Sequence, residues 1–469
     1  MNIASKHSMT SMTYGLLGHR GIGIGIFSLV VASCSGTLKP TPTHESDAGS
    51  SLLDGSSDAA PQPQNIVTAK SQQTHIAQPD ISDSDYQSVI GATNQFGFDL
   101  FHNVVATDTT NIVFSPTSTV YALAMTYLGA RDNTQTQLAS NLHDTLASEV
   151  FHTGLNRLSI ELASRNIAPH TTIYGEQSLS LSLVDAIWVQ QNYTLLSSYL
   201  DALAVNYDAG INLLDFVGNP EGSRSTINQW VADKTANRIQ DLMPQGSISA
   251  TTRVVLTNAL YFKGSWLNPF MATSTADATF NRLNGTPVTV SAMHADRYCM
   301  YTEGTGYQLV DLPYDGNRLS MTILLPAQGQ FVTIRDGVSQ SWLTQNIVAM
   351  VSAEVQLAIP KFNFIWGTKN LSQALQALGI VAAFDATLAD FSGIEASRHF
   401  YVDGVLHKAF IAVDESGTEA AAATAVSLST SGIPTTPKSF VADRPFVFFI
   451  RDTTGAILFA GQVLDPSQN

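Results

Sequence analysis

The chain has 469 residues, of which 44% are hydrophobic and only 13% are charged, with a formal net charge of −15. This length supports one large domain or two to three ordinary ones. The scarcity of Lys and Arg argues against a nucleic-acid-binding protein, which needs a basic surface. Two cysteines exclude a disulfide scaffold and a multi-cysteine zinc site.

The N-terminus is typical of an export signal. Lys6 and Arg20 give a positive start, and residues 21–33 form an apolar run. That run is too short for a membrane-spanning helix, which needs about 20 residues, but suits the core of a signal peptide. We therefore predict a signal peptide over residues 1–33.

The sequence VASC at the end of this run resembles the processing box of a bacterial lipoprotein. This predicts a lipid on Cys34; the alternative is an ordinary signal peptide with a chance cysteine. Ser35, rather than Asp, follows, which by resemblance to Gram-negative lipoproteins favours the outer membrane. We expect a cell-envelope lipoprotein of the outer membrane, periplasmic or surface-exposed, or an extracellular protein. The lipid would be its only contact with the membrane.

A polar segment follows over residues 35–83, rich in Ser, Thr, Pro, Gln and Asp and without a sustained apolar period. This composition predicts a disordered tether, with a mean reach on the order of 40 Å. No second linker and no internal repeat follows. The sequence thus divides into a signal peptide (1–33), a lipidated cysteine with its tether (34–83) and one folded domain (84–469).

Helices are expected in the first half of this domain. Apolar residues recur every three or four positions over residues 89–104, which predicts a helix with one buried face. Ser115 followed by Pro116 is typical of a helix start. A further apolar stripe over residues 227–239 predicts one helix that stops before Pro244.

Strands are expected in the second half. Apolar segments flank the turn sequences DGN (315–317) and TTG (453–455), which predicts two β-hairpins. Helices early and strands late, without regular alternation, indicate an α+β fold.

Seven segments, in family order, resemble the serpin family of serine protease inhibitors. The sequence GVLHKAFIAVDESGTEAAAATAV (404–426) resembles the strand and hinge that lead into the reactive-centre loop. The other six segments are 111–130, 257–266, 312–326, 355–364, 377–394 and 440–466. The resemblance covers roughly residues 84–467. It implies a single domain with three β-sheets, about nine helices and an exposed reactive-centre loop.

The hinge also carries a pattern of its own. After Glu419 no charged residue occurs until Lys438, and small or apolar side chains alternate with polar or small ones. This period of two predicts a strand that can be buried; the alternative is a flexible linker. The hinge residues are Glu415, Gly417, Thr418, Glu419, Ala420, Ala421, Ala422 and Ala423. When the hinge adds to the main sheet, Thr418 is expected to be the first residue to enter it. Glu419 is expected on the opposite face, where substitutions are better tolerated.

The resemblance implies suicide inhibition: a protease attacks the loop, and the freed hinge inserts into the main sheet and carries the acylated protease along. Counting from the hinge glycine places the reactive bond between Ser431 and Gly432, with Thr430 and Leu428 as alternatives. Because no Lys or Arg lies in the loop, the expected partner is an elastase-, subtilisin- or chymotrypsin-like serine protease rather than a trypsin-like one; a cysteine endopeptidase is a further candidate. The protein is expected to be a monomer, with no cofactor, no metal and no enzymatic activity of its own.

Five residues match the positions at which the family opens its main sheet. Ser115, Ser118, Asn258 and His407 correspond to a buried polar cluster, and Trp266 to a tryptophan at the top of the sheet. Ser115 and His407 could alternatively be a nucleophile and its base, but no GxSxG sequence surrounds Ser115. The competing function within the family is a non-inhibitory serpin that acts as a binding or storage protein.

Overall fold

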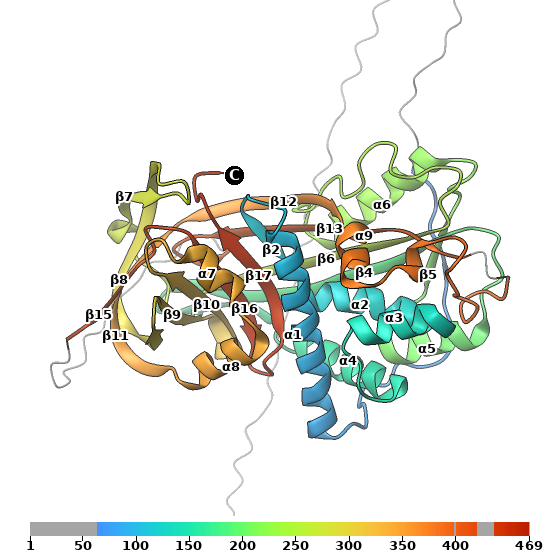
Figure 1. The fold of residues 1–469 in the computed structure, drawn as a ribbon, viewed down its shortest axis with the longest axis horizontal. Coiled ribbons are helices and arrows are strands. Elements are labelled where there is room, and N and C mark those ends of the chain that lie inside the picture. The colour runs from blue at the N-terminus through green and yellow to red at the C-terminus, as the bar shows by residue number, and fades with distance from the viewer. Residues whose placement is uncertain (1–62, 398–399, 420–435, 469) are drawn as a thin grey trace, which may run out of the picture. The chain divides into compact units, whose positions relative to one another are not determined.

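The computed structural model describes residues 63–397, 400–419 and 436–468 (Figure 1). The predictions for the signal peptide, Cys34, the alanines at 420–423 and the reactive-bond residues Leu428, Thr430, Ser431 and Gly432 lie outside the described residues. The described part contains nine α-helices. They are α1 (Asp83–Val105), α2 (Pro116–Tyr127), α3 (Asp132–Asn141), α4 (Ser148–Ala163), α5 (Ser197–Tyr207), α6 (Pro220–Lys234), α7 (Phe331–Asp336), α8 (Gln340–Val348) and α9 (Ser372–Leu378).

The first sheet has eight strands and holds the described start of the predicted hinge. Its order is β1 (Val67–Ala69), β5 (Ile211–Leu214), β4 (Gly175–Gln190), β6 (Val254–Ser265), β14 (Gly417–Thr418), β13 (Val402–Val413) and β12 (Phe362–Asn370), with β3 (Ile167–Thr172) paired to β4. Strands β6 and β13 pair directly and in parallel, from Val254 with Val402 to Asn258 with His407. Further along, the short strand β14 lies between them.

The second sheet has nine strands. Its order is β15 (Lys438–Val441), β11 (Val351–Pro360), β8 (Pro287–Gly304), β9 (Tyr307–Pro313), β10 (Leu319–Pro326), β16 (Phe446–Asp452), β17 (Ile457–Val463) and β2 (Ile112–Phe114), with β7 (Ala276–Asn281) paired to β8. The α+β fold is confirmed. The described strands form two hydrogen-bonded sheets rather than three, because the long strand β8 pairs with β7, β11 and β9 in one continuous ladder.

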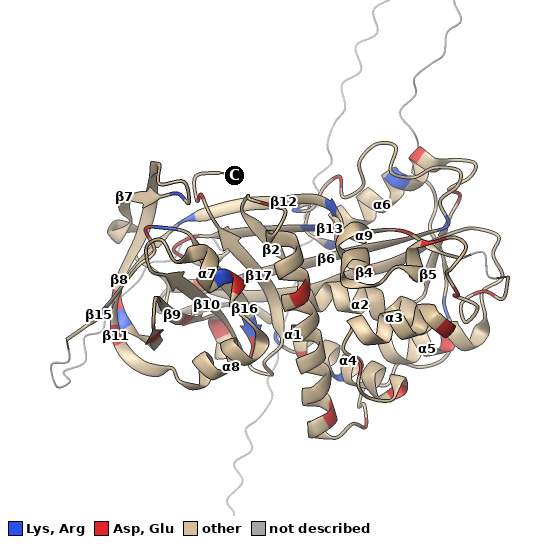
Figure 2. Ribbon diagram, in the orientation of Figure 1, with Lys and Arg blue, Asp and Glu red and all other residues tan. Residues whose placement is uncertain are grey.

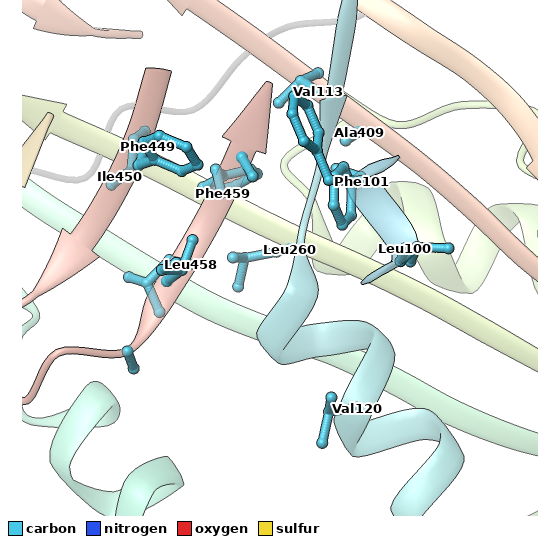
Figure 3. Close-up of a cluster of buried hydrophobic side chains, with 14 of the residues drawn as sticks. Leu100, Phe101, Val113, Val120, Leu260, Ala409, Phe449, Ile450, Leu458 and Phe459 are labelled. Atoms are coloured by element: carbon cyan, nitrogen blue, oxygen red, sulfur yellow. The ribbon is translucent and has the colours of Figure 1, made fainter. Parts of the chain in front are cut away.

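A hydrophobic core lies between these elements. Figure 3 shows side chains from helices and from both sheets meeting in one cluster. Leu100 and Phe101 of α1, Val120 of α2 and Phe449 of β16 are fully buried, and Leu260 of β6 is 2% exposed. Burial of apolar surface on this scale is the main source of stability for such a domain. Charged side chains are sparse over the helices and strands (Figure 2).

Most of the local predictions are confirmed. Helix α1 covers the apolar stripe at 89–104, and the Ser115 side chain caps α2 by accepting from the Ser118 N–H at 3.1 Å. Both hairpins form, as β9–β10 and β16–β17. Their turns place Gly316 (φ 77°) and Gly455 (φ 98°) in the left-handed region that glycine tolerates.

The helix predicted from the apolar stripe at 227–239 ends earlier than expected. Helix α6 stops at Lys234, because Ala236 and Asn237 have φ values of 48° and 61° that interrupt a right-handed helix. Ile239 lies beyond the helix but is still buried in the same hydrophobic cluster as Ile227. The apolar stripe thus predicted burial correctly and the helix as far as Lys234, but it placed the end of the helix too late.

The prediction of a disordered tether is wrong for its last part, residues 63–82. Strand β1 pairs with β5, and the Ile76 N–H donates to the Val205 carbonyl at 3.1 Å. The Gln64 side chain donates to Ser223 Oγ at 2.7 Å and to the Asn219 carbonyl at 2.8 Å. Polar composition did not reveal this segment because main-chain pairing and amide hydrogen bonds hold much of it.

Candidate functional site: the hinge and the centre of the first sheet

The start of the hinge already occupies a place in the first sheet. Gly417 pairs with Ser265 and Thr418 with Gly264, while on the other side Thr418 pairs with Val413. The Glu419 N–H donates to the Ala412 carbonyl at 2.8 Å. The expectation that Thr418 still has to enter the sheet is therefore wrong: it is seated between β6 and β13 before any cleavage.

Gly417 can sit there only because it lacks a side chain. A Cβ atom at this position would come within 2.0 Å of the Gly264 carbonyl oxygen, and the residue has φ 156°. Such a contact with backbone cannot be relieved by a side-chain rotation. The hinge glycine is thus required by close packing against β6.

Thr418 is held by an aromatic pair at the top of the sheet. Its side chain is buried, and its hydroxyl lies 2.7 Å from the Tyr314 hydroxyl. Tyr314 stacks on Trp266, with ring centroids 4.5 Å apart. Trp266 also donates from Nε1 to the Asp414 carbonyl at 3.0 Å. Trp266 therefore contacts the entry to the hinge directly, as well as packing in the core.

Glu419 does not lie on a tolerant, solvated face. Its side chain is 7% exposed and forms an ion pair with Arg238, whose side chain is 53% exposed. The second carboxylate oxygen, Oε2, is buried without a partner. Burial raises the pKa of Glu419, while Arg238 and Lys263 act in the opposite direction.

Glu415 fastens the turn before the hinge. Its carboxylate accepts from Thr275 Oγ1 at 2.7 Å and pairs with Lys361 Nζ at 2.8 Å. Its carbonyl accepts from the Phe270 N–H at 2.8 Å. Burial alone would raise the pKa of Glu415, but the hydrogen bonds from Lys361 and Thr275 and the charge of Lys361 hold it below its usual value.

The polar cluster predicted from the sequence lies where β6 and β13 meet. Ser115, Ser118, Asn258 and His407 are all fully buried. His407 Nδ1 lies 2.5 Å from Asn258 Oδ1, across the last parallel pair of the two strands. Asn258 Nδ2 donates to Ser118 Oγ at 2.5 Å. One hydrogen-bonded chain thus joins β13, β6 and helix α2.

The Ser–His catalytic alternative finds no support in this geometry. Ser115 Oγ accepts from a backbone N–H as a helix cap, and His407 bonds to Asn258 instead. Burial lowers the pKa of His407 to about 3, so the imidazole is neutral. Among the described residues, no group of three or more His, Cys, Asp or Glu is placed to hold a metal ion.

The sequence reasoning missed Asp185, which completes the cluster. Asp185 lies on β4 directly opposite Asn258. Its Oδ1 accepts from Ser118 Oγ at 2.8 Å and from Asn258 Nδ2 at 2.7 Å. The available signal was a single acidic residue inside the apolar run LVDAIWV (183–189).

Three comparisons bear on the family of this chain. The sequence pattern described as "Serpin (serine protease inhibitor)" matches residues 91–466. A serpin-like protein of Thermococcus kodakarensis is 38% identical over 390 residues, covering 82% of this chain and 88% of the relative. Leukocyte elastase inhibitor A of Rattus norvegicus is 33% identical over 393 residues, covering 81% of this chain and all of the relative.

The fold agrees with these sequence matches. The crystal structure of the thermophilic serpin tengpin in its native state superposes with a TM-score of 0.75 at 27% identity, covering 86% of this chain and all of tengpin. A family match over most of the chain, together with the seated hinge and the polar cluster, settles the assignment. This chain belongs to the serpin family.

Proposed function

We propose that this protein inhibits serine endopeptidases as a suicide substrate. The observation that carries the proposal is the start of the hinge, where β14 already lies between β6 and β13. In the sequence that follows, small or apolar residues alternate with polar or small ones, which is the pattern of a strand that can be buried. A cut in the loop would free this strand to extend between β6 and β13 as those two strands part. The protein would be consumed by the reaction and would not turn over.

The proposed reaction begins as ordinary proteolysis. The protease nucleophile attacks the carbonyl carbon of Ser431, the bond to Gly432 breaks, and the new amine takes a proton from the protease. The acyl-enzyme then remains on the freed end of the hinge. Inserting about 14 residues at roughly 3.3 Å each displaces the protease by on the order of 45 Å or more.

Insertion must separate β6 from β13 below Thr418. Side-chain hydrogen bonds join these strands from His407 to Asn258 and from the Val254 N–H to Asp403, and the main-chain pairs from Val254 to Asn258 must also part. About a dozen new ladder hydrogen bonds, at about 0.5–1.5 kcal/mol each, supply on the order of 10 kcal/mol. Losing one oxyanion-hole donor slows a protease by about 10²–10³-fold, so a distorted protease holds its acyl bond.

The proposed targets are elastase-, subtilisin- or chymotrypsin-like proteases. The loop contains no Lys or Arg, and a relative bears the name leukocyte elastase inhibitor. We expect a denaturation-resistant complex with at least one of these enzymes and none with trypsin. Mass analysis of the complex locates the acyl bond; a protease whose nucleophilic serine is replaced by alanine is the control.

The competing function, a binding or storage serpin, predicts the opposite result. Such a protein would be cleaved in the loop by the same proteases and would form no covalent complex with any of them. That outcome, with loop cleavage demonstrated, would overturn the inhibitory proposal.

We further propose that the inhibitor is anchored in the cell envelope through a lipid on Cys34. The sequence VASC at the end of the predicted signal peptide supports this proposal. Among the helices that the structure describes, none is long and apolar enough to cross a membrane. Cys34→Ala should abolish metabolic labelling with a fatty acid and release the domain from the membrane fraction. Unchanged labelling of the variant would refute the anchor.

A further inference from the structure

Asp185 is a half-buried residue whose carboxyl group has no cation beside it. Its Oδ1 accepts two hydrogen bonds, from Ser118 and Asn258, but its Oδ2 is buried and has no partner. Burial raises the pKa of Asp185 and these two hydrogen bonds lower it, with no contribution from Lys or Arg. Ionising the carboxyl group in such a place costs free energy because the charge is desolvated, whereas the neutral acid is tolerated.

The groups around Asp185 do not compensate its charge. Asp185 lies on the wall of a cavity of about 470 Å³ that is also lined by Tyr121 of α2, Tyr207 of α5, Asp208 and His75. Burial keeps both tyrosines neutral by raising the pKa of each above its ordinary value. On the β13 side, Asn258 stands between Asp185 and the neutral imidazole of His407.

The position of Asp185 ties it to the opening of the sheet. Asn258 bonds to Asp185 on one side and to His407 on the other, and the second of these bonds crosses the gap that insertion must widen. Breaking it frees the Asn258 amide and admits water to the cluster. Water solvates a carboxylate far better than a carboxylic acid, so the ionised group favours the open sheet.

We propose that Asp185 is a proton-dependent positioning residue that holds the sheet closed while it is neutral and favours opening when it ionises. This rests on the proposed function, because opening matters only if the loop inserts. The role is distinct from that of His407 and Asn258, which form the bond that breaks. Asp185 sets how readily that bond breaks at a given pH.

The direction of the pH effect follows from the binding of the proton. Burial raises the pKa of Asp185 from 3.8 to about 8, so the closed sheet binds the proton more tightly than an open or unfolded chain does. The penalty of ionisation is absent below about pH 4, grows as the pH rises towards 8, and is constant above that. The closed sheet is therefore most favoured in acid.

Asp185→Asn tests the inference because asparagine has the same shape and can accept the same two hydrogen bonds. Melting temperatures of the full chain and the variant are compared from pH 4 to pH 9. We expect no difference at pH 4, and a variant that melts several degrees higher at pH 8. Other groups titrate identically in both proteins and cancel in the difference. An offset that stays constant with pH would mean a merely structural role and would overturn the inference.

A second measurement reports on sheet opening itself. A synthetic peptide with the sequence of residues 420–430, which follows the part of the hinge already in the sheet, is offered as an added strand, and its rate of uptake is followed in both proteins. The ratio of the wild-type rate to the Asp185→Asn rate should rise several-fold from pH 5 to pH 8. In the matched control Asp144→Asn, which alters another carboxyl whose pKa burial raises, the corresponding ratio should not change with pH.

The two proposals fail in different ways. If the wild type neither takes up peptide nor traps a protease, the proposed function is wrong, while the melting series still decides whether Asp185 holds its proton. If the wild type takes up peptide and the ratio is independent of pH, the role assigned to Asp185 in opening is wrong and the inhibitory function stands.

Discussion

At the residue scale, the structure changes what a substitution at Thr418 is expected to do. The alternation of the hinge identifies it as a residue that faces inward, but not when it becomes buried. Because it is already buried against Tyr314, a substitution there affects the uncleaved protein as well as the insertion step.

Thr418→Arg should convert the protein from an inhibitor into a substrate. Burial of an unpaired guanidinium costs several kcal/mol, so β14 leaves its place in the native protein and insertion begins with the same penalty. Hydrolysis of the acyl-enzyme then outruns trapping. The measurement is the number of inhibitor molecules consumed per protease trapped. Thr418→Val, which keeps the shape and loses the hydroxyl, is the control and should stay near wild type. Covalent complex at wild-type stoichiometry in Thr418→Arg would contradict the mechanism.

The Glu419–Arg238 pair should respond asymmetrically. Removing Arg238 leaves a buried carboxylate unpaired, whereas removing the charge of Glu419 leaves a half-exposed guanidinium that water solvates. Arg238→Gln should therefore destabilise the pairing of the hinge start with β13, by on the order of 1 kcal/mol. Glu419→Gln should not. The rate of hydrogen exchange at the Glu419 amide, which bonds to the Ala412 carbonyl, measures how often this pairing opens. Equal acceleration in both variants would show that the ion pair does not have this role.

At the scale of elements, the helices and hairpins that depend on local sequence patterns could be predicted. Helix α1 and the hairpins β9–β10 and β16–β17 follow from periodicity and turn residues alone. The end of α6 does not, because its left-handed residues Ala236 and Asn237 are ordinary side chains that could continue a helix. Among the hinge residues, the family resemblance identified Glu419 but not its ion pair, since Arg238 lies 181 positions away in the sequence.

Asp185 shows the same limit within the candidate site. A lone acidic residue in an apolar strand indicates an unusual environment, yet its partners depend on the register of β4 against β6. Only the pairing of these strands brings it to Asn258 and Ser118. The four other members of the cluster were found through resemblance to a family, not through any pattern that the chain itself displays.

At the scale of the whole molecule, cleavage in the loop should raise stability. If the loop inserts as proposed, β14 would lengthen into a full strand of the first sheet, and the nicked chain would gain hydrogen bonds that the intact chain lacks. Nicking with a protease that is not trapped, followed by thermal unfolding, should give a melting temperature about 10 °C higher, as expected for a gain on the order of 10 kcal/mol in a domain of this size. An unchanged or lower value would favour the binding or storage function.

Strand β1 has a consequence for solubility. The outer edge of β5 would otherwise be a row of unpaired main-chain groups able to align with another molecule, and edges of this kind promote aggregation. β1 covers that edge with only three residues, and Lys70 follows it directly, paired with Asp208. A short strand next to a charged residue is a poor template for further pairing. β1 thus closes one edge of the first sheet to pairing with other molecules.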